Sequence, residues 1–251
     1  MIITDPFFYF LAVPAVLITG MGKGGLGGAA GAIAVPMMAL AVEPIQAAAI
    51  LLPIICLMDI MAVKTFWKTV DVPSLKIIIP ASLIGVAVGS VMLGSVSPVM
   101  LKAIVGVISV LFALNYWLVG NRFDNLATSK ASGWICGAMA GFTSLQIHAG
   151  APPLSIYLMP KQLDKYVLLG TMAIFFAVVD YMKLIPYGML GQLDLSNLYT
   201  SLLLAPLGPI GVILGYRVLK YTSQLVIYRI IYFLLFATGL KLVWDSARAW
   251  V

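Results

Sequence analysis

Residues 20–31 read Gly-Met-Gly-Lys-Gly-Gly-Leu-Gly-Gly-Ala-Ala-Gly, with seven glycines in twelve positions and one lysine, Lys23, among them. They lie in the middle of a longer apolar stretch, Phe7–Val42, of 36 residues. A membrane-spanning helix needs about 20 residues, so this stretch is too long for one straight span and marginal for two. Because glycine disfavours helix interiors, we expect two short helices joined by unwound backbone within residues 20–31.

A second apolar stretch, Trp134–Met159, is interrupted in a similar way. Its centre carries the polar run Thr-Ser-Leu-Gln-Ile-His at residues 143–148, and two prolines follow at 152 and 153. Polar residues and paired prolines are poor interiors for a helix in a bilayer. We therefore expect two short helices joined by unwound backbone here as well.

The composition predicts an all-α polytopic membrane protein. Of the 251 residues, 62% are hydrophobic and 10% are charged, and the mean hydropathy is +1.07. A soluble domain is about 45–50% apolar and about 25% charged, which excludes a soluble enzyme, a disordered chain and a nucleic-acid-binding domain. With the two interrupted stretches, six further stretches of span length make about eight hydrophobic segments: Pro44–Val63, Pro73–Leu93, Pro98–Leu118, Tyr166–Tyr187, Ser196–Tyr216 and Gln224–Trp244.

The two halves of the chain repeat. A shift of 121 residues places Gly20 on Gly141 and Asp59 on Asp180, and a shift of 126 places the PxxxIGVxxG pattern at residues 80–89 on that at residues 206–215. Many transporters consist of two copies of one membrane unit. We therefore predict two repeats, residues 1–120 and 121–251, in one membrane domain, each with one interrupted stretch and three spanning helices.

The basic loops indicate that the repeats are inverted. Lys64 follows the second hydrophobic stretch of the first half, whereas Lys161 follows the first stretch of the second half. If each interrupted stretch is a re-entrant hairpin, each half crosses three times and ten basic residues face the cytoplasm against three acidic ones. If each interrupted stretch crosses once, the basic loops divide between both faces. Cytoplasmic loops carry an excess of Lys and Arg, which favours the hairpins. In that arrangement both termini and Lys183 face outward, with Asp59 nearer the cytoplasm and Asp180 nearer the outside.

Within the glycine-rich stretch, Lys23 is the residue that indicates a binding site. The match to G-x-G-x-x-G is not a dinucleotide site, because its flanks are apolar membrane segments and not a strand. Helix packing through GxxxG pairs explains some of the glycines but not the lysine. A lysine is costly in hydrocarbon and half-helix N-termini attract anions, so we predict a small-anion site with Lys23 as the only fixed positive charge of the membrane core. The predicted ligands are Lys23, Gly22, Gly24, Gly25 and Gly27 and, around Ser144 as the repeat counterpart of Lys23, Thr143, Gln146 and His148.

Three titratable side chains within apolar stretches are candidates for proton coupling, namely Asp59, Asp180 and His148. An ionisable residue in a membrane span is a functional hypothesis by default, and histidine changes charge near neutral pH. The alternatives are structural hydrogen bonds or, for Asp180, an ion pair with Lys183 three residues later. With one histidine and two cysteines in apolar stretches, we predict no metal site, no cofactor and no catalytic residue.

The chain resembles the sulfite exporter TauE/SafE family, also called TSUP. The resemblance covers the whole chain and rests on the glycine-rich first stretch, its polar counterpart at residues 141–153, the PxxxIGVxxG repeat and the length. It implies a secondary transporter of small sulfur-containing or organic anions such as sulfite, sulfonates and sulfoacetate. Family members usually carry a glycine-rich stretch in both halves, whereas here the second has fewer glycines and a histidine, which leaves the particular anion open.

We therefore expect a secondary transporter, working as an exporter and coupled to protons or to the membrane potential, in a prokaryotic cytoplasmic membrane. Its partners would be a small anion, bound between the interrupted stretches, and the lipid bilayer, with no nucleic acid. The oligomeric state stays open. An uncoupled small-anion channel is the alternative. An intramembrane enzyme lacks paired catalytic groups, and the lysine argues against a cation carrier.

Overall fold

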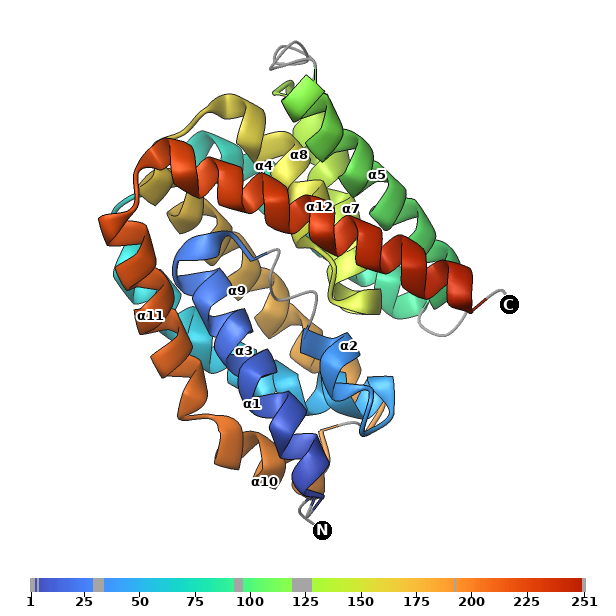
Figure 1. Cartoon of the computed structure of the whole chain (residues 1–251). Helices are drawn as coiled ribbons and strands as arrows, with labels where there is room; N and C mark the ends of the chain where they lie inside the picture. The colour runs from blue at the N-terminus through green and yellow to red at the C-terminus, as the bar shows by residue number, and fades with distance from the viewer. Residues whose placement is uncertain are drawn as a thin grey trace.

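The computed structural model describes residues 3, 5–28, 34–92, 97–118, 128–191 and 193–249. Every regular element in these residues is helical, and the helices pack into one all-α body (Figure 1). The predicted boundary near residue 120 and the predicted cytoplasmic loop at Arg122 lie outside the described residues. The elements are α1 (Pro6–Met21), the π-helical segment η1 (Gly22–Leu26), α2 (Ala34–Met38), α3 (Pro44–Phe66), α4 (Val72–Val91), α5 (Pro98–Leu118), α7 (Lys130–Ile147), α8 (Ala151–Leu158), the 3-10 turn η3 (Met159–Lys161), α9 (Lys165–Met189), α10 (Leu195–Leu204), α11 (Leu207–Tyr221) and α12 (Gln224–Arg248).

Several of these helices are long and apolar enough to cross a membrane, which confirms the prediction of a multi-pass membrane protein. α10 and α11 together form one more candidate, bent by 42°. The predicted stretch Ser196–Tyr216 therefore corresponds to this bent pair, which is broken where Pro206 lacks the N–H that would continue α10. In α5, Lys102–Leu118 is a shorter apolar helix. The five straight candidates among the described residues are Pro6–Leu26, Gln46–Phe66, Val72–Val91, Lys165–Met189 and Gln224–Arg248.

The first interrupted stretch stays helical further than predicted. α1 continues directly into η1, which contains Lys23, and the chain leaves helical geometry at Gly27 and Gly28, whose φ angles are 78° and 70°. Glycine adopts these left-handed angles without a steric penalty. The prediction of unwound backbone is therefore wrong at Gly20 and Lys23. Gly31, the end of the predicted break, lies outside the described residues. Beyond the break, α2 packs back against α1.

The second interrupted stretch behaves in the same way. α7 runs unbroken through Thr143, Ser144 and Gln146, so these residues are helical and not unwound as predicted. The helix ends at His148, whose φ of 53° is left-handed, and α8 begins three residues later with two prolines in its first turn. Prolines are tolerated there because the first N–H groups of a helix have no helical partner. α8 packs back against α7.

Glycines bring each interrupted stretch into backbone contact with a helix of the other half. A β-carbon on Gly24 of η1 would lie 2.1 Å from the carbonyl oxygen of Val212 in α11. Likewise, a β-carbon on Gly141 of α7 would lie 2.2 Å from the carbonyl oxygen of Ser82 in α4. This close approach confirms the helix-packing interpretation of these glycines, and it explains why the glycine-rich stretch remains helical. Each PxxxIGVxxG pattern packs on the interrupted stretch of the other half.

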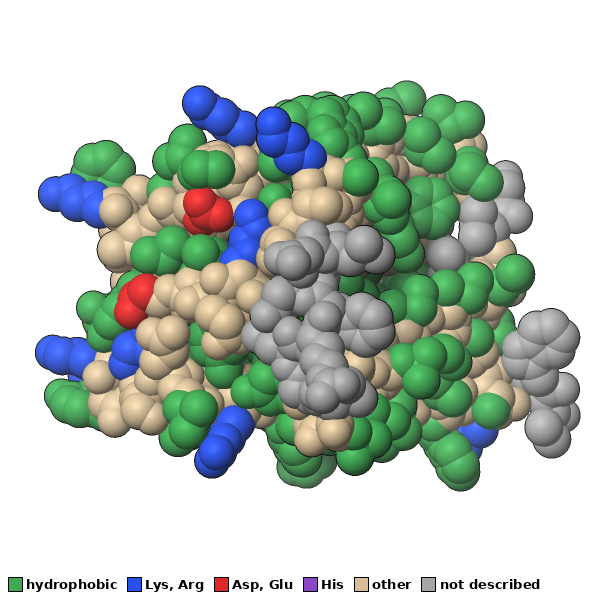
Figure 2. Space-filling view, turned by 90° about the horizontal axis from the view of Figure 1, so that it is seen from above, with side chains coloured by type: hydrophobic (Ala, Val, Ile, Leu, Met, Phe, Trp, Pro, Cys, Tyr) green, Lys and Arg blue, Asp and Glu red, His purple; other side chains and the backbone are tan. Residues whose placement is uncertain are grey.

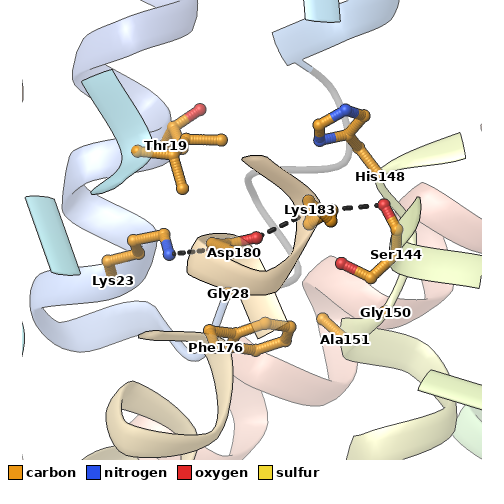
Figure 3. Close-up of a pocket in the computed structure, with 11 residues that line it drawn as sticks. Thr19, Lys23, Gly28, Ser144, His148, Gly150, Ala151, Phe176, Asp180 and Lys183 are labelled. Atoms are coloured by element: carbon orange, nitrogen blue, oxygen red, sulfur yellow. Dashed lines mark hydrogen bonds and ion pairs between the residues drawn. The ribbon is translucent and has the colours of Figure 1, made fainter. Parts of the chain in front are cut away.

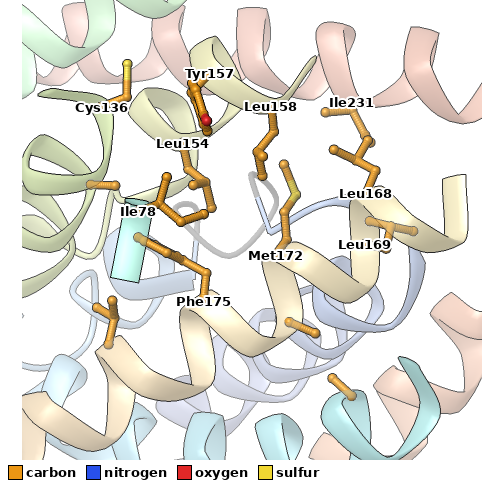
Figure 4. Close-up of a cluster of buried hydrophobic side chains, with 14 of the residues drawn as sticks. Ile78, Cys136, Leu154, Tyr157, Leu158, Leu168, Leu169, Met172, Phe175 and Ile231 are labelled. Atoms are coloured by element: carbon orange, nitrogen blue, oxygen red, sulfur yellow. The ribbon is translucent and has the colours of Figure 1, made fainter. Parts of the chain in front are cut away.

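Two further helix pairs complete the body, with α3 packed on α9 and α5 packed on α12 (Figure 1). A buried hydrophobic cluster between α8, α9 and α12 includes Leu158, Met172 and Ile231 (Figure 4). Hydrophobic side chains also cover much of the face seen in Figure 2, where Lys and Arg side chains gather mainly toward one side. A large apolar exterior suits contact with lipid. In contrast to this apolar exterior, a group of charged side chains lies inside the body, where η1 meets α3 and α9.

Candidate functional site

Lys23 lies inside the fold on the π-helical segment η1. Its side chain is 9% exposed, and η1 contacts both α3 and α9. Its Nζ donates hydrogen bonds to Oδ1 of Asp59 in α3 and to Oδ2 of Asp180 in α9, the second at 2.7 Å. Both carboxylates are buried, so Lys23 holds two ion pairs that water screens only weakly.

The two aspartates at equivalent positions of the repeats thus meet at one ammonium group. The prediction that Asp59 lies nearer the cytoplasm and Asp180 nearer the outside is therefore wrong. The sequence shift pairs these two residues, and the packing of α3 on α9 brings both carboxylates to the same place.

A second buried lysine, Lys183 on α9, extends this group of charges. Its Nζ lies 2.7 Å from Oδ1 of Asp180 and donates a hydrogen bond of 3.2 Å to the carbonyl oxygen of Ser144. The ion pair considered for Asp180 is thus present. Lys183 is only 1% exposed, so the prediction that it faces outward is wrong. The prediction that Lys23 is the only positive charge of the core is wrong for the same reason. Asp180 and the last turn of α7 hold the side chain inside, and a helix C-terminus favours a cation.

A cavity of about 40 Å³ lies between these groups. Since one water needs about 10–15 Å³ of such space, the cavity has room for roughly three waters. Figure 3 shows Lys23 on one side of it, Ser144 and His148 on the other, and Asp180 and Lys183 between them. A smaller cavity of about 10 Å³ also touches Lys23 and is bordered by Asp59. The larger cavity is lined by Thr19, Lys23, Gly28, Ile55, Ser144, His148, Gly150, Ala151, Phe176, Asp180 and Lys183.

Five of the predicted ligands border these two cavities. Lys23, Ser144 and His148 line the larger one, and Gly22 and Gly27, again with Lys23, line the smaller one. Lys23 of the first half thus lies at one cavity with two of the four predicted polar residues of the second half, Ser144 and His148.

The other predicted ligands have structural partners. Gln146 donates a hydrogen bond of 3.0 Å to the carbonyl oxygen of Gly89 in α4. Thr143 donates one of 2.9 Å to the carbonyl oxygen of Ala149 at the end of α7. Residues 24–25 pack against α11. In the described part of the chain none of these four lines either cavity, so they hold the surrounding helices in place.

Two cavity residues, Phe176 and Thr19, were missed by the sequence reasoning. The ring centroid of Phe176 lies 5.6 Å from Lys23 Nζ, which is within the range of a cation–π contact. Phe176 precedes Asp180 by four residues, and Thr19 precedes Lys23 by four. Residues four apart share one face of a helix, so this spacing from the predicted charges was the signal that could have found both.

The site is electrically balanced when its four charged side chains are ionised, with Lys23 and Lys183 against Asp59 and Asp180. Asp180 uses one carboxylate oxygen for each lysine, whereas Oδ2 of Asp59 has no hydrogen-bond partner among the described residues. A buried polar atom without a partner is costly, so this oxygen is a place where the site can accept a proton. No cluster of three His, Cys, Asp or Glu side chains that could hold a metal occurs in the described ranges.

Comparison with known proteins assigns the chain to a family. Residues 12–242 match the model of the family described as sulfite exporter TauE/SafE. This chain belongs to the TauE/SafE family. No curated protein and no solved structure was found to match it.

The match confirms the family resemblance. Because TauE/SafE proteins are membrane transporters, it also confirms the prediction that the chain is not an enzyme. The family also implies a small anion as substrate and the membrane as surroundings. In this TauE/SafE protein Lys23 and Lys183 line the cavity. Both lysines are paired with carboxylates, so any anion that entered the cavity would have to compete with Asp59 or Asp180 for them.

Proposed function

We propose that this TauE/SafE protein is a secondary transporter that exports a small sulfur-containing or organic anion such as sulfite, a sulfonate or sulfoacetate. The observation that carries the proposal is that two lysines line one cavity, Lys23 from the first half with a side chain 9% exposed and the buried Lys183 from the second. A sulfite or sulfonate group presents three oxygens, which can accept hydrogen bonds from both ammonium groups. Charge-assisted hydrogen bonds of this kind are the strong ones.

We further propose that residues 1–120 and 121–251 are inverted repeats that rock about the cavity and expose it alternately to the two faces. The helix pairs support this proposal because they are reciprocal. α1 and η1 pack on α11 as α7 packs on α4, while α3 packs on its counterpart α9, and α5 on α12. The return of α2 onto α1 and of α8 onto α7 supports the re-entrant hairpins.

The contacts of the basic loops support inverted repeats whose basic segments share one face, as we propose for a prokaryotic cytoplasmic membrane. Lys161 donates a hydrogen bond of 2.8 Å to Ser74 Oγ, which joins η3 to the start of α4. Lys165 donates one of 2.8 Å to the carbonyl oxygen of Leu219, which joins the start of α9 to the end of α11. Basic segments of both halves thus lie at one end of the molecule. The positive-inside rule makes this the cytoplasmic end.

Transport into proteoliposomes tests the proposed function. Wild-type protein is expected to move sulfite, methanesulfonate or sulfoacetate with saturable kinetics. Lys23→Met and Lys183→Met should each reduce the transport rate at low anion concentration about tenfold or more, since a hydrogen bond to a charged group contributes about 1.5–3 kcal/mol. The matched control is Lys241→Met, because Lys241 pairs with Asp245 at the surface. Ohmic single-channel currents in place of saturable transport would indicate an uncoupled channel and contradict the proposal.

A further inference from the structure

The two carboxylates of the site are held differently. Asp180 places one oxygen 2.7 Å from Lys23 and the other 2.7 Å from Lys183. Asp59 holds Lys23 through Oδ1 alone, and its Oδ2 is buried without a hydrogen-bond partner among the described residues. A proton on Asp180 would displace a lysine, whereas a proton on Oδ2 of Asp59 displaces no hydrogen bond. The geometry therefore leaves Asp59 as the carboxylate that can take up a proton.

The surroundings of Asp59 set the charge balance of that step. Lys23 on η1 and Lys183 on α9 oppose Asp59 and Asp180, and these four formal charges sum to zero. Among the described residues, α10 and α11, which also pack on α3, contribute no charged side chain to either cavity. The titratable and charged groups that act on Asp59 or border its site are Lys23, Asp180, Lys183, His148, Cys56 and Tyr181.

A bound anion changes this balance. A monovalent anion would leave the buried site with one net negative charge, which is costly in a membrane core. A proton on Asp59 restores the balance. It also weakens the hold of Asp59 on Lys23, so that this ammonium group, with its three donors, can turn a hydrogen bond toward the anion. A dianion with the same single proton would still leave the site negatively charged.

We propose that Asp59 is the proton carrier of this transporter and that one monovalent anion crosses together with one proton, in an electroneutral cycle. The proton binds Oδ2 of Asp59 on the side where the anion enters and leaves with the anion on the other side, so export is driven by the outward concentration gradient of the anion. This inference rests on the proposed function and specifies the charge of its substrate. The substrate is a monoanion, such as hydrogensulfite or an alkyl sulfonate, and not a dianion such as sulfate, so among the anions of the proposed function fully ionised sulfoacetate is excluded.

The test compares pH-driven and potential-driven accumulation in proteoliposomes. Methanesulfonate is the monovalent probe and sulfate the divalent one, and potassium with valinomycin sets the potential. A gradient of one pH unit should concentrate methanesulfonate about tenfold, as expected for one proton per anion. A potential of about 100 mV should leave that ratio unchanged, whereas a carrier that moves one net charge would change it about fifty-fold. Accumulation that follows the potential, or transport of sulfate in preference to methanesulfonate, would overturn the inference.

Variants assign the proton to a residue. Asp59→Asn is expected to lose the tenfold pH-driven accumulation while still exchanging methanesulfonate across the membrane at a reduced rate. Asp245→Asn is the matched control, because Asp245 pairs with Lys241 at the surface, and it should keep the full accumulation. Wild-type accumulation in Asp59→Asn would overturn the assignment.

The proposed function and the inference can fail separately. A wild-type protein that moves none of the probe anions would overturn the proposed function, and the inference with it. A wild-type protein that moves them but follows the potential would overturn the inference alone. If Asp59→Asn does not fold, the wild-type measurements still decide whether the cycle is electroneutral.

Discussion

Replacement of Lys23 by methionine is expected to destabilise the protein as well as weaken anion binding. Methionine keeps most of the side-chain volume and removes the charge that two buried carboxylates share. Asp59 would then keep no hydrogen-bond partner among the described residues, while Asp180 would keep Lys183. Removing one member of a buried ion pair costs about 3–5 kcal/mol. At about 2–4 °C per kcal/mol for a chain of this size, the melting temperature should fall by about 6–20 °C.

Thermal unfolding in detergent, followed with a thiol-reactive dye, measures this effect, because Cys56 and Cys136 are both buried in the folded protein. Lys241→Met breaks an exposed ion pair and should cost only about 0–1 kcal/mol. Adding Asp59→Asn to Lys23→Met should raise the melting temperature again, since it removes the unpaired charge. Equal melting temperatures for Lys23→Met and Lys241→Met, or a further decrease in the double variant, would refute the reasoning.

Two more predictions concern packing and topology. Gly24→Ala should destabilise the protein by about 1–3 kcal/mol or prevent its assembly, because the new methyl group meets the α11 backbone; Gly188→Ala, with nothing within 4 Å of the new carbon, should leave the melting temperature close to that of wild type. Single cysteines in place of Lys64 and Lys161, in a background without Cys56 and Cys136, should both react with a membrane-impermeant thiol reagent from the cytoplasm. Labelling of the two positions from opposite sides would contradict inverted repeats.

Much of the helical layout could be predicted because apolar length alone defines a spanning helix. The stretches Pro44–Val63 and Tyr166–Tyr187 each fall within one observed helix, α3 and α9. The points at which the interrupted stretches break could not be predicted in this way. Glycine propensity favours unwinding around Lys23, but the helix continues to Leu26 because α11 packs on its glycines. The GxxxG pairs indicate that a helix packs on this stretch, but they do not indicate which one, because α11 is distant in the sequence.

The site was also predicted only in part, because several of its residues meet through contacts between distant parts of the chain. Lys23 was found because helix packing gives no role to a lysine, and the repeat found Asp59 and Asp180. Their meeting at Lys23 depends on the packing of α3 against α9, which the residues around either aspartate do not encode. Lys183 was placed outside because three crossings per half put the end of the stretch Tyr166–Tyr187 at the outer face. Its bond to the carbonyl oxygen at the end of α7 is a tertiary contact that only the fold shows.

The backbone contact between η1 and α11 also affects how the protein is made. Gly24 precedes its partner Val212 by 188 residues, and Lys23 precedes Asp180 by 157. At about 5–20 residues per second, α11 leaves the ribosome roughly 10–40 s after η1. During that interval the glycine face of η1 lacks α11 to pack on, and for most of it Asp180 has not yet been made, so that Asp59 is the one carboxylate of the two available to Lys23. A chain that ends before α11 would therefore be an unfinished membrane protein with a charged, unpacked helix, the kind of intermediate that membrane proteases and insertion chaperones have to recognise.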